Sequence, residues 1–187
     1  VGRGRKIAIS EEMGFPDSVG LFYSAMTSHC GFDVNDGEYK LMGLAPYGSP
    51  RYVEALRENV IRIFDDGSVR LDQRWFDYRA GRRMGSRRLD QLLDGPPRDT
   101  SAPLSEREAD IACSAQIILE EVVLAMARHV HRQTGESALC TAGGVALNCA
   151  ANRRLREDGP FDSVWVQPAA GDSGGAIGAA MWTWHQI

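Results

Sequence analysis

The chain has 187 residues, of which 43% are apolar, a size and composition that suit one folded domain or part of a larger one. Its net charge of −4 provides no basic surface for nucleic acid. No apolar run approaches the roughly 18 residues that span a membrane, and too few apolar residues follow the basic start for a signal peptide. We therefore expect neither nucleic acid nor membrane as a partner.

The cysteines Cys30, Cys113, Cys140 and Cys149 show no Cys-x-x-Cys spacing and lie mostly inside apolar segments. Because zinc sites usually draw their ligands from close pairs, we expect reduced, buried thiols of a cytoplasmic protein instead. The chain begins with Val1 instead of Met, so we also expect further sequence before it.

The first predicted elements are a short strand at 6–10 and a helix from Asp17 to Cys30. Polar residues at positions 17 and 18 offer N-cap oxygens, and Gly31 is placed to end the helix. Apolar residues recur at the spacing of a helix that buries one face. They are Val19, Phe22, Tyr23 and Met26.

The next stretch contains spaced glycines and predicts a short helix over Glu38–Leu44. Another helix is expected from Ser49 to Asn59, with a proline at its first helical position. Alternating residues on both sides of an Asp-Gly turn then predict a β-hairpin with strands 61–64 and 69–71.

Residues 77–103 are rich in Arg, Gly, Asp and Pro, and we expect a surface insertion whose arginine run is a solvated face. The longest helix follows. Ser105 and Glu108 form a capping box, an apolar stripe continues to Val130, and Gly135 ends the helix.

Two similar units complete the chain, each with a strand, a glycine turn and a helix. The first unit is strand Ser137–Thr141, turn Gly143-Gly144 and helix Ala146–Arg156, and the second is strand Ser163–Gln167, Gly171 and helix Gly174–Trp184. A glycine turn that opens a helix suits phosphate, because the first helical N–H groups lack partners and glycine lets the anion approach. Neither turn matches the Walker or the dinucleotide-binding pattern.

These turns suggest chemistry for a few residues. Gly143 and Gly144 could cradle phosphates, with Asn148 one turn into the helix, although the glycines could equally serve only close packing. Asp172 lies beside the second turn, where phosphate would repel a carboxylate unless a cation lay between them. We therefore interpret Asp172 as a metal ligand, with a helix N-cap as the alternative.

Four blocks of sequence resemble those of the NodU/CmcH-type O-carbamoyltransferases in order and spacing, over nearly the whole chain. They are residues 18–27, 37–48, 141–152 and 167–180. The resemblance implies an α/β fold of the actin-like ATPase (ribonuclease H-like) class, similar to the tRNA threonylcarbamoyl-transfer proteins. Residues 1–187 would be the C-terminal part of the N-terminal carbamoyltransferase domain, a truncated subdomain with a β-hairpin insertion.

The resemblance also implies an activity. Such enzymes use ATP to transfer a carbamoyl group from carbamoyl phosphate, through carbamoyl-adenylate, to a hydroxyl of a sugar or secondary metabolite, as in antibiotic biosynthesis. A divalent metal, with iron expected, lies beside the nucleotide. The implied partners are a preceding N-terminal segment and a C-terminal adenylate-forming domain of the same enzyme.

The family's site residues can be placed by position. Those expected at the nucleotide phosphates are Gly143, Gly144, Val145 and Asn148, with Gly171 at the second turn. Those expected on the ribose and adenine side are Asp17, Gly37, Lys40 and Gly43. Asp172 would be the last metal ligand, and the Lys40 ammonium would face the nucleotide or carbamoyl oxygens; we assign catalytic roles to these two residues.

The sequence also departs from the family pattern. The family's His-x-x-x-His helix and a further Asp ligand have no match here. His129 and His131 are two residues apart and so lie on different helix faces, and we expect His29 and His185 to be solvent-exposed. We expect the isolated chain to bind nucleotide weakly, to lack activity and to dimerise through apolar faces.

Two other functional classes remain open. One is an actin-like ATP-binding domain of kinase or chaperone type without carbamoyl transfer, in which the same turns would serve ATP alone. The other is a non-catalytic module that uses the fold for protein contact, in which case the glycines would only serve packing.

Overall fold

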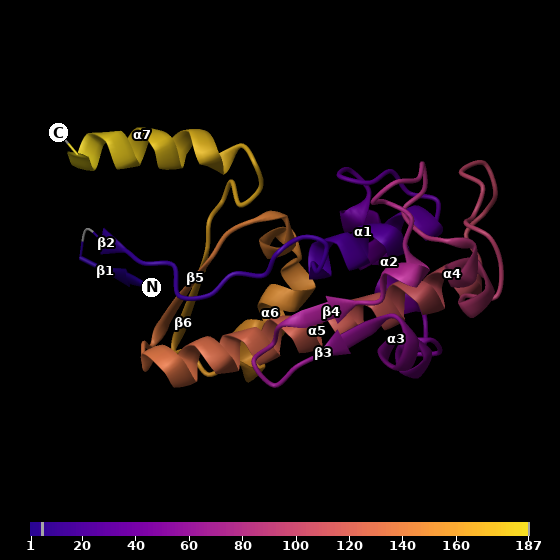
Figure 1. Ribbon diagram of the computed structural model, residues 1–187, viewed down its shortest axis with the longest axis horizontal. Coiled ribbons are helices and arrows are strands. Elements are labelled where there is room, and N and C mark those ends of the chain that lie inside the picture. The colour runs from indigo at the N-terminus through magenta and orange to yellow at the C-terminus, as the bar shows by residue number, and fades with distance from the viewer. Residues whose placement is uncertain (5, 187) are drawn as a thin grey trace.

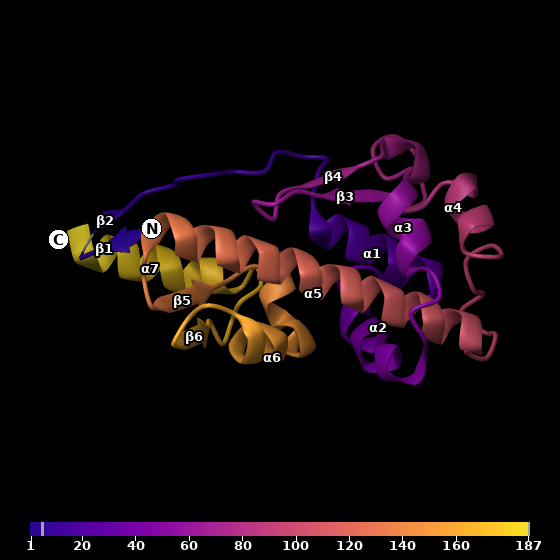
Figure 2. The same cartoon turned by 90° about the horizontal axis from the view of Figure 1, so that it is seen from below.

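A long helix, α5 (Glu106–Thr134), runs along much of the length of the molecule (Figure 2). Its start has the predicted capping box between Ser105 and Glu108, and Gly135 ends it in the left-handed conformation at φ 66°. The computed structural model describes residues 1–4 and 6–186, and in this part of the chain the fold is mixed α/β with three two-stranded sheets. The predicted α/β class is confirmed at this level.

The elements before α5 are β1 (Gly2–Arg3), β2 (Lys6–Ile7), α1 (Val19–His29), α2 (Glu38–Leu44), the 3-10 helix η1 (Ala45–Tyr47), α3 (Val53–Asn59), β3 (Ile61–Ile63), β4 (Val69–Leu71), the 3-10 helix η2 (Gln73–Trp75) and α4 (Arg87–Leu92). Those after it are β5 (Ala138–Thr141), the 3-10 helix η3 (Gly144–Leu147), α6 (Cys149–Asp158), β6 (Ser163–Val166) and α7 (Gly174–Gln186). Helices α1, α2, α3 and α6 all contact α5.

Helix α1 forms as predicted, but its N-cap is Ser18, whose Oγ accepts the N–H of Leu21 over 3.3 Å. The predicted apolar stripe is buried. Gly31 follows the helix at φ +73°, and a Cβ there would lie 2.6 Å from the carbonyl oxygen of Arg98. Both the left-handed conformation and this close approach therefore require glycine at position 31.

Helix α2 has the predicted bounds, whereas α3 begins at Val53 and not at Ser49. The backbone N–H and the hydroxyl of Ser49 both donate to Asp110 Oδ1 on α5, over 2.7 and 2.8 Å. This long-range contact holds residues 49–52 in a turn, so the prediction of a helix starting at the proline was wrong.

The β3–β4 hairpin is antiparallel, as predicted, and pairs Ile61 with Leu71 and Ile63 with Val69. Gly67 in its turn has φ +80°, and a Cβ there would collide with the backbone of Met126 on α5. The predicted strand at 6–10 is shorter in the structure, where β2 covers Lys6–Ile7 and pairs with β1.

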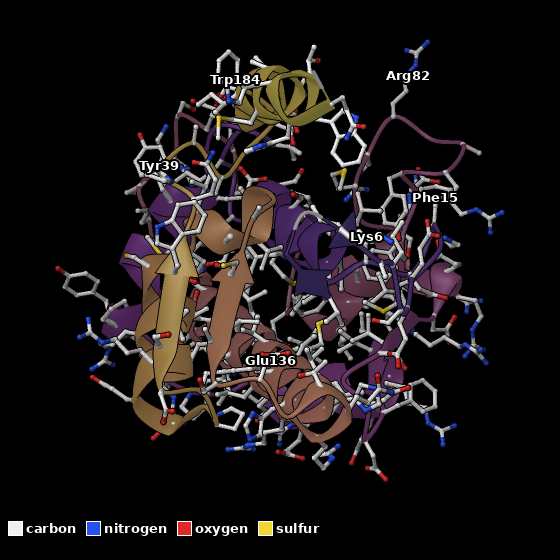
Figure 3. All side chains as sticks on the ribbon, turned by 90° about the vertical axis from the view of Figure 1, so that its left-hand side faces the viewer. Lys6, Phe15, Tyr39, Arg82, Glu136 and Trp184 are labelled. Carbon is white, nitrogen blue, oxygen red and sulfur yellow. The ribbon has the colours of Figure 1, made fainter. Side chains whose placement is uncertain are left out.

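The segment 77–103 is exposed over much of its length, yet it is fixed to the core at two places. Leu89 and Leu93, on and just after α4, are fully buried. Arg98 donates from Nε to the carbonyl of Cys30 over 2.8 Å and from Nη2 to that of Gly31 over 3.2 Å. The segment's arginine run is exposed as predicted, and Figure 3 shows Arg82 pointing outward.

The structure contradicts the expected burial of two cysteines and the expected exposure of one histidine. Cys30 is buried and Cys113 partly so, but Cys140 and Cys149 are exposed, because β5 and the start of α6 lie at the surface. His29 is only 2% exposed, because α4 and the segment after it cover the end of α1. All four cysteines are free thiols.

The final helix, α7, has no buried residue and lies apart from α5, beyond the ends of β5 and β6 (Figure 1). Its exposed apolar side chains are Ile177, Met181, Trp182 and Trp184. In the described residues, no helix combines the length and the apolar character needed to cross a bilayer.

Candidate functional site

The two glycine turns lie side by side because β5 and β6 are parallel neighbours. Thr141 pairs with Val166 at the carboxyl ends of these strands, so both strands end at the same edge of the sheet. The turns are joined directly, since the N–H of Gly143 donates to the carbonyl of Ala170 over 2.7 Å. Crevices outside the carboxyl ends of parallel strands are common ligand sites in α/β proteins.

The first turn has a backbone that requires glycine for its conformation and not for packing. Gly143 has φ +101°, and a Cβ at Gly143 or Gly144 would meet nothing within 4 Å. The alternative that these glycines serve close packing is therefore not supported by their surroundings. The N–H groups of Gly144 and Val145 open η3, where the first donors lack helical partners.

The helix predicted at 146–156 begins differently. Residues from Gly144 to Leu147 form the 3-10 helix η3, and α6 starts only at Cys149. Asn148 is consequently the N-cap of α6, with its Oδ1 accepting the N–H of Ala151 over 2.9 Å. The expectation that Asn148 lies one turn into a helix was wrong, because the chain makes a tighter turn before the α-helix starts.

A cleft of about 780 Å³ opens at this edge of the sheet. One wall is η3 with the loop after β6, and the other is the N-terminal half of α1 with α2 and the loop before it. Leu119 of α5 contributes to the lining. Thus segments more than a hundred residues apart in the sequence form one site.

The structure places half of the predicted site residues in the lining of this cleft. They are Gly144, Val145, Asn148, Gly171 and Asp172. Gly143 adjoins it in the same turn. Asp17 instead accepts the N–H of Leu71 through Oδ1 over 2.8 Å, on the hairpin side of α1.

The other predicted residues lie on or beside α2, outside the lining. Gly37 is the N-cap of α2, where a Cβ would lie 2.6 Å from Phe32 Cβ, so its small size serves packing. Lys40 is exposed, with its Nζ 5.7 Å from the ring centre of Tyr39, a lining residue. A Cβ at Gly43 would meet no atom within 4 Å, so packing does not require glycine at this position.

Asp172 is exposed, and no hydrogen bond to its carboxylate is found in the described part of the chain. An N-cap role is therefore not supported, and the carboxylate is free for a ligand. However, residues 1–4 and 6–186 contain no group of three His, Cys, Asp or Glu side chains placed to hold a metal. The described residues therefore supply fewer than three ligands of a metal shell.

Sequence reasoning missed the acidic wall of the cleft. Glu38 Oε1 accepts the hydroxyl of Ser24 over 2.7 Å and the N–H of Asn35 over 3.1 Å. With Asp36 and Asp172, the part of the lining that comes from described residues holds three carboxylates and no lysine or arginine. The helical periodicity of α1 assigned its stripe to the core and gave no signal that Ser24 faces a ligand site.

Sequence reasoning also missed a buried polar network that reaches the cleft, with Tyr23 and Asn148 in the lining. The hydroxyl of Tyr23 donates to Gln116 Oε1 over 2.9 Å, and Gln116 in turn contacts Asn148. Burial raises the pKa of Tyr23 well above its usual value. The phenol therefore stays protonated and remains a hydrogen-bond donor.

Comparison with known proteins gives a family match over this whole region. The family described as "Carbamoyltransferase N-terminus" matches residues 1–181. The chain is 49% identical over 185 residues to the uncharacterized protein sll1178 of Synechocystis, covering 99% of this chain and 30% of that protein.

Two nodulation proteins are also similar. Nodulation protein NolO of Bradyrhizobium diazoefficiens is 38% identical over 183 residues, which is 97% of this chain and 31% of that protein. Nodulation protein U of Sinorhizobium fredii is 46% identical over 79 residues, which is 41% of this chain and 14% of that protein. The chain thus spans less than a third of the length of these relatives.

Proposed function

We propose a function from the premise that this chain belongs to the carbamoyltransferase family, as part of the N-terminal region of such an enzyme. The NodU-type resemblance predicted from the sequence is confirmed by this match. The whole protein transfers a carbamoyl group to a hydroxyl of a sugar or secondary metabolite, and the cleft between the glycine turns and α1 holds the nucleotide part of the donor.

The observation that carries this proposal is the joining of both glycine turns to one cleft. The hydrogen bond between Gly143 and Ala170 keeps the two turns together, and Asp172 lies at the second turn. Phosphate oxygens fit the first turn, since the N–H groups of Gly144 and Val145 open a helical turn and no side chain blocks Gly144.

The nucleoside end of the donor fits the opposite wall. There the Glu38 carboxylate and the Ser24 hydroxyl can hydrogen-bond ribose hydroxyls. Tyr39 provides an exposed aromatic ring in the same wall. We keep Lys40 as a flexible cation at the rim, where its ammonium can swing from the Tyr39 ring toward donor oxygens.

The charge of the lining supports a role for a divalent cation. Among residues 1–4 and 6–186, the lining has three carboxylates and no basic side chain, so a nucleotide in the cleft needs a counter-charge. Asp172 would supply one ligand to such an ion, with iron as our expectation and the remaining ligands outside the described residues. The ion would provide Lewis-acid chemistry when bound.

Water hydrolyses carbamoyl phosphate to carbamate and phosphate, and a carbamate oxygen bonds to the α-phosphorus of ATP as pyrophosphate leaves, which gives carbamoyl-adenylate. The acceptor oxygen then bonds to the carbamoyl carbon while AMP departs and the acceptor proton passes to solvent. The residues of this chain serve that transfer by binding and orientation. The backbone of the first turn holds the phosphate of the leaving AMP, and the walls of the cleft fix the nucleoside. No side chain of the cleft is assigned as a general base.

We extend the proposal to the fold of the intact domain, an actin-like ATPase fold. It is supported by two successive strand, turn and helix units whose strands pair in parallel and whose turns share one cleft. The chain would supply one of the two subdomains that enclose nucleotide in that class.

The full-length protein tests this function through its products. Incubation with ATP and carbamoyl phosphate should release pyrophosphate, and addition of a hydroxyl acceptor should yield AMP and a carbamate ester. A kinase or chaperone-type ATPase would instead produce ADP, and the appearance of ADP without pyrophosphate would overturn the proposal. A non-catalytic module would turn over neither substrate.

A further inference from the structure

A buried pair of amides joins the long helix to the start of α6. Gln116 on α5 is 6% exposed and Asn148 is 8% exposed. Gln116 Nε2 donates to Asn148 Oδ1 over 3.0 Å, and Asn148 Nδ2 donates to Gln116 Oε1 over 2.9 Å. The two side chains thus exchange a reciprocal pair of hydrogen bonds, which fixes them relative to each other.

The neighbours of this pair determine which way each amide faces. The backbone N–H of Ala151 donates to Asn148 Oδ1 over 2.9 Å, and only an oxygen can accept it. Similarly, the Glu120 carboxylate accepts from Gln116 Nε2 over 2.9 Å, while the Tyr23 hydroxyl donates to Gln116 Oε1 over 2.9 Å. Flipping Asn148 would place its NH2 group against the N–H of Ala151, and flipping Gln116 would place its oxygen against the Glu120 carboxylate.

Counting donors and acceptors leaves one group free. Gln116 uses both of its amide hydrogens and both lone pairs of its oxygen. Asn148 uses both oxygen lone pairs and one amide hydrogen. The second hydrogen of Asn148 Nδ2 makes no further hydrogen bond of normal geometry in the described residues, although the Tyr23 hydroxyl also lies close to this amide. Of the two amides, Asn148 is the one that lines the cleft.

We propose that Gln116 is a positioning residue for the nucleotide, holding the Asn148 amide so that its free N–H binds a donor oxygen in the cleft. Gln116 does not touch the ligand itself. Tyr23 and Glu120 hold Gln116 from two sides, so α1 and α5 both support the amide. The inference rests on the proposed function, because it assigns the oxygen to ATP or its carbamoylated product.

The test uses the full-length protein and measures its Kd for ATP by calorimetry together with its Tm. Gln116→Met keeps a similar volume but removes all four hydrogen bonds, and we expect the Kd to rise about tenfold or more. Tyr23→Phe removes a single donor, and we expect a rise of about threefold. Gln133→Met changes an exposed glutamine on the same helix and should leave the Kd unchanged.

A double-mutant cycle separates positioning from general destabilisation. Asn148→Ser retains a side-chain oxygen for the N-cap but removes the amide. If Gln116 acts through Asn148, adding Gln116→Met to Asn148→Ser should change the Kd by less than about twofold, whatever happens to the Tm. Fully additive losses of affinity would overturn the inference, because Gln116 would then act by another route.

The outcomes also separate this inference from the proposed function. Wild-type protein that binds ATP, with Gln116→Met binding equally well, overturns the positioning role alone. Wild-type protein that binds no ATP overturns the proposed function and the inference with it. If Gln116→Met does not fold, the cycle is run with Tyr23→Phe in its place, because Tyr23 also lines the cleft. An unchanged Kd in Tyr23→Phe, or a loss of affinity fully additive with that of Asn148→Ser, then counts against the proposal.

Discussion

The N–H of Gly143 donates to the carbonyl oxygen of Ala170 over 2.7 Å, so a main-chain hydrogen bond ties the turn after β5 to the turn after β6. This bond depends on the unusual backbone of Gly143, with φ +101° and ψ 166°. Gly143 therefore adds a direct bond between the two turns to the pairing of β5 with β6 that already places them side by side.

Gly143→Ala should destabilise the chain by about 1–3 kcal/mol, because alanine cannot adopt this backbone without strain. Gly144→Ala is the matched control, since the neighbouring glycine has ordinary φ and open space for a Cβ. Urea unfolding of both variants measures the difference. Equal stabilities would show that the turn rearranges at no cost.

Asp172→Asn should leave stability within about 0.5 kcal/mol of the parent, because no hydrogen bond to this carboxylate is found in the described residues. In the full-length enzyme it should lower carbamoyl transfer at least about tenfold and reduce bound metal. Asp162→Asn, an exposed aspartate just before β6, controls for loss of charge. Metal content and activity that match those of the parent would remove Asp172 from the site.

His29 should make the stability depend on pH. Burial, aided by the nearby Arg107 guanidinium, lowers the pKa of His29 to about 4. Below the ordinary histidine pKa of about 6.5, His29 is protonated in the unfolded chain but stays neutral in the native chain. The free energy of unfolding therefore falls as the pH drops from about 6.5 to 4. We expect a loss of about 2 kcal/mol between pH 7 and pH 5.

The measurement is urea unfolding at both pH values, with His29→Phe as the test variant. Phenylalanine cannot take up a proton, so the variant should lose most of this difference. A pH dependence identical to that of the parent would mean that other groups cause it.

Arg98→Met should cost about 1–3 kcal/mol, because it frees the carbonyls of Cys30 and Gly31 from the guanidinium. Arg82→Met, in the same segment but exposed, should change stability by less than about 0.5 kcal/mol. Thermal unfolding compares the two. Proteolysis of the 77–103 segment should also accelerate in Arg98→Met alone.

The isolated 187-residue chain should self-associate at micromolar concentration, since α7 carries exposed apolar side chains. Replacing Trp182 and Trp184 by Gln should weaken this association, which analytical ultracentrifugation measures. Figure 3 shows Trp184 on the outer side of the molecule. Tyr47→Gln, on a different exposed surface, should have no effect.

Local sequence signals predicted most of the elements. The capping box at Ser105, the Asp-Gly hairpin and the parallel units around the two turns act over a few residues, and the structure confirms each of them. What failed depended on distant contacts. The start of α3 is set by Ser49 binding Asp110, 61 positions away, which no local pattern reveals.

Only the part of the site that local sequence signals mark could be predicted. Glycines and Asp172 stand out in the sequence, so the turn side of the cleft could be proposed. The polar network at the cleft joins Tyr23 to Gln116 across 93 positions and Gln116 to Asn148 across 32 positions. Gln116 looks like any polar residue on a long helix until the fold brings these partners together.

The acidic lining has a consequence for the order of binding. Free ATP and the empty cleft carry charges of the same sign, so without divalent cations added salt should help association by screening repulsion. A divalent cation lowers the charge of the three lining carboxylates from −3 to −1, so both the repulsion and its dependence on salt should weaken once the ion is bound. Nucleotide should therefore bind more tightly after the cation than before it.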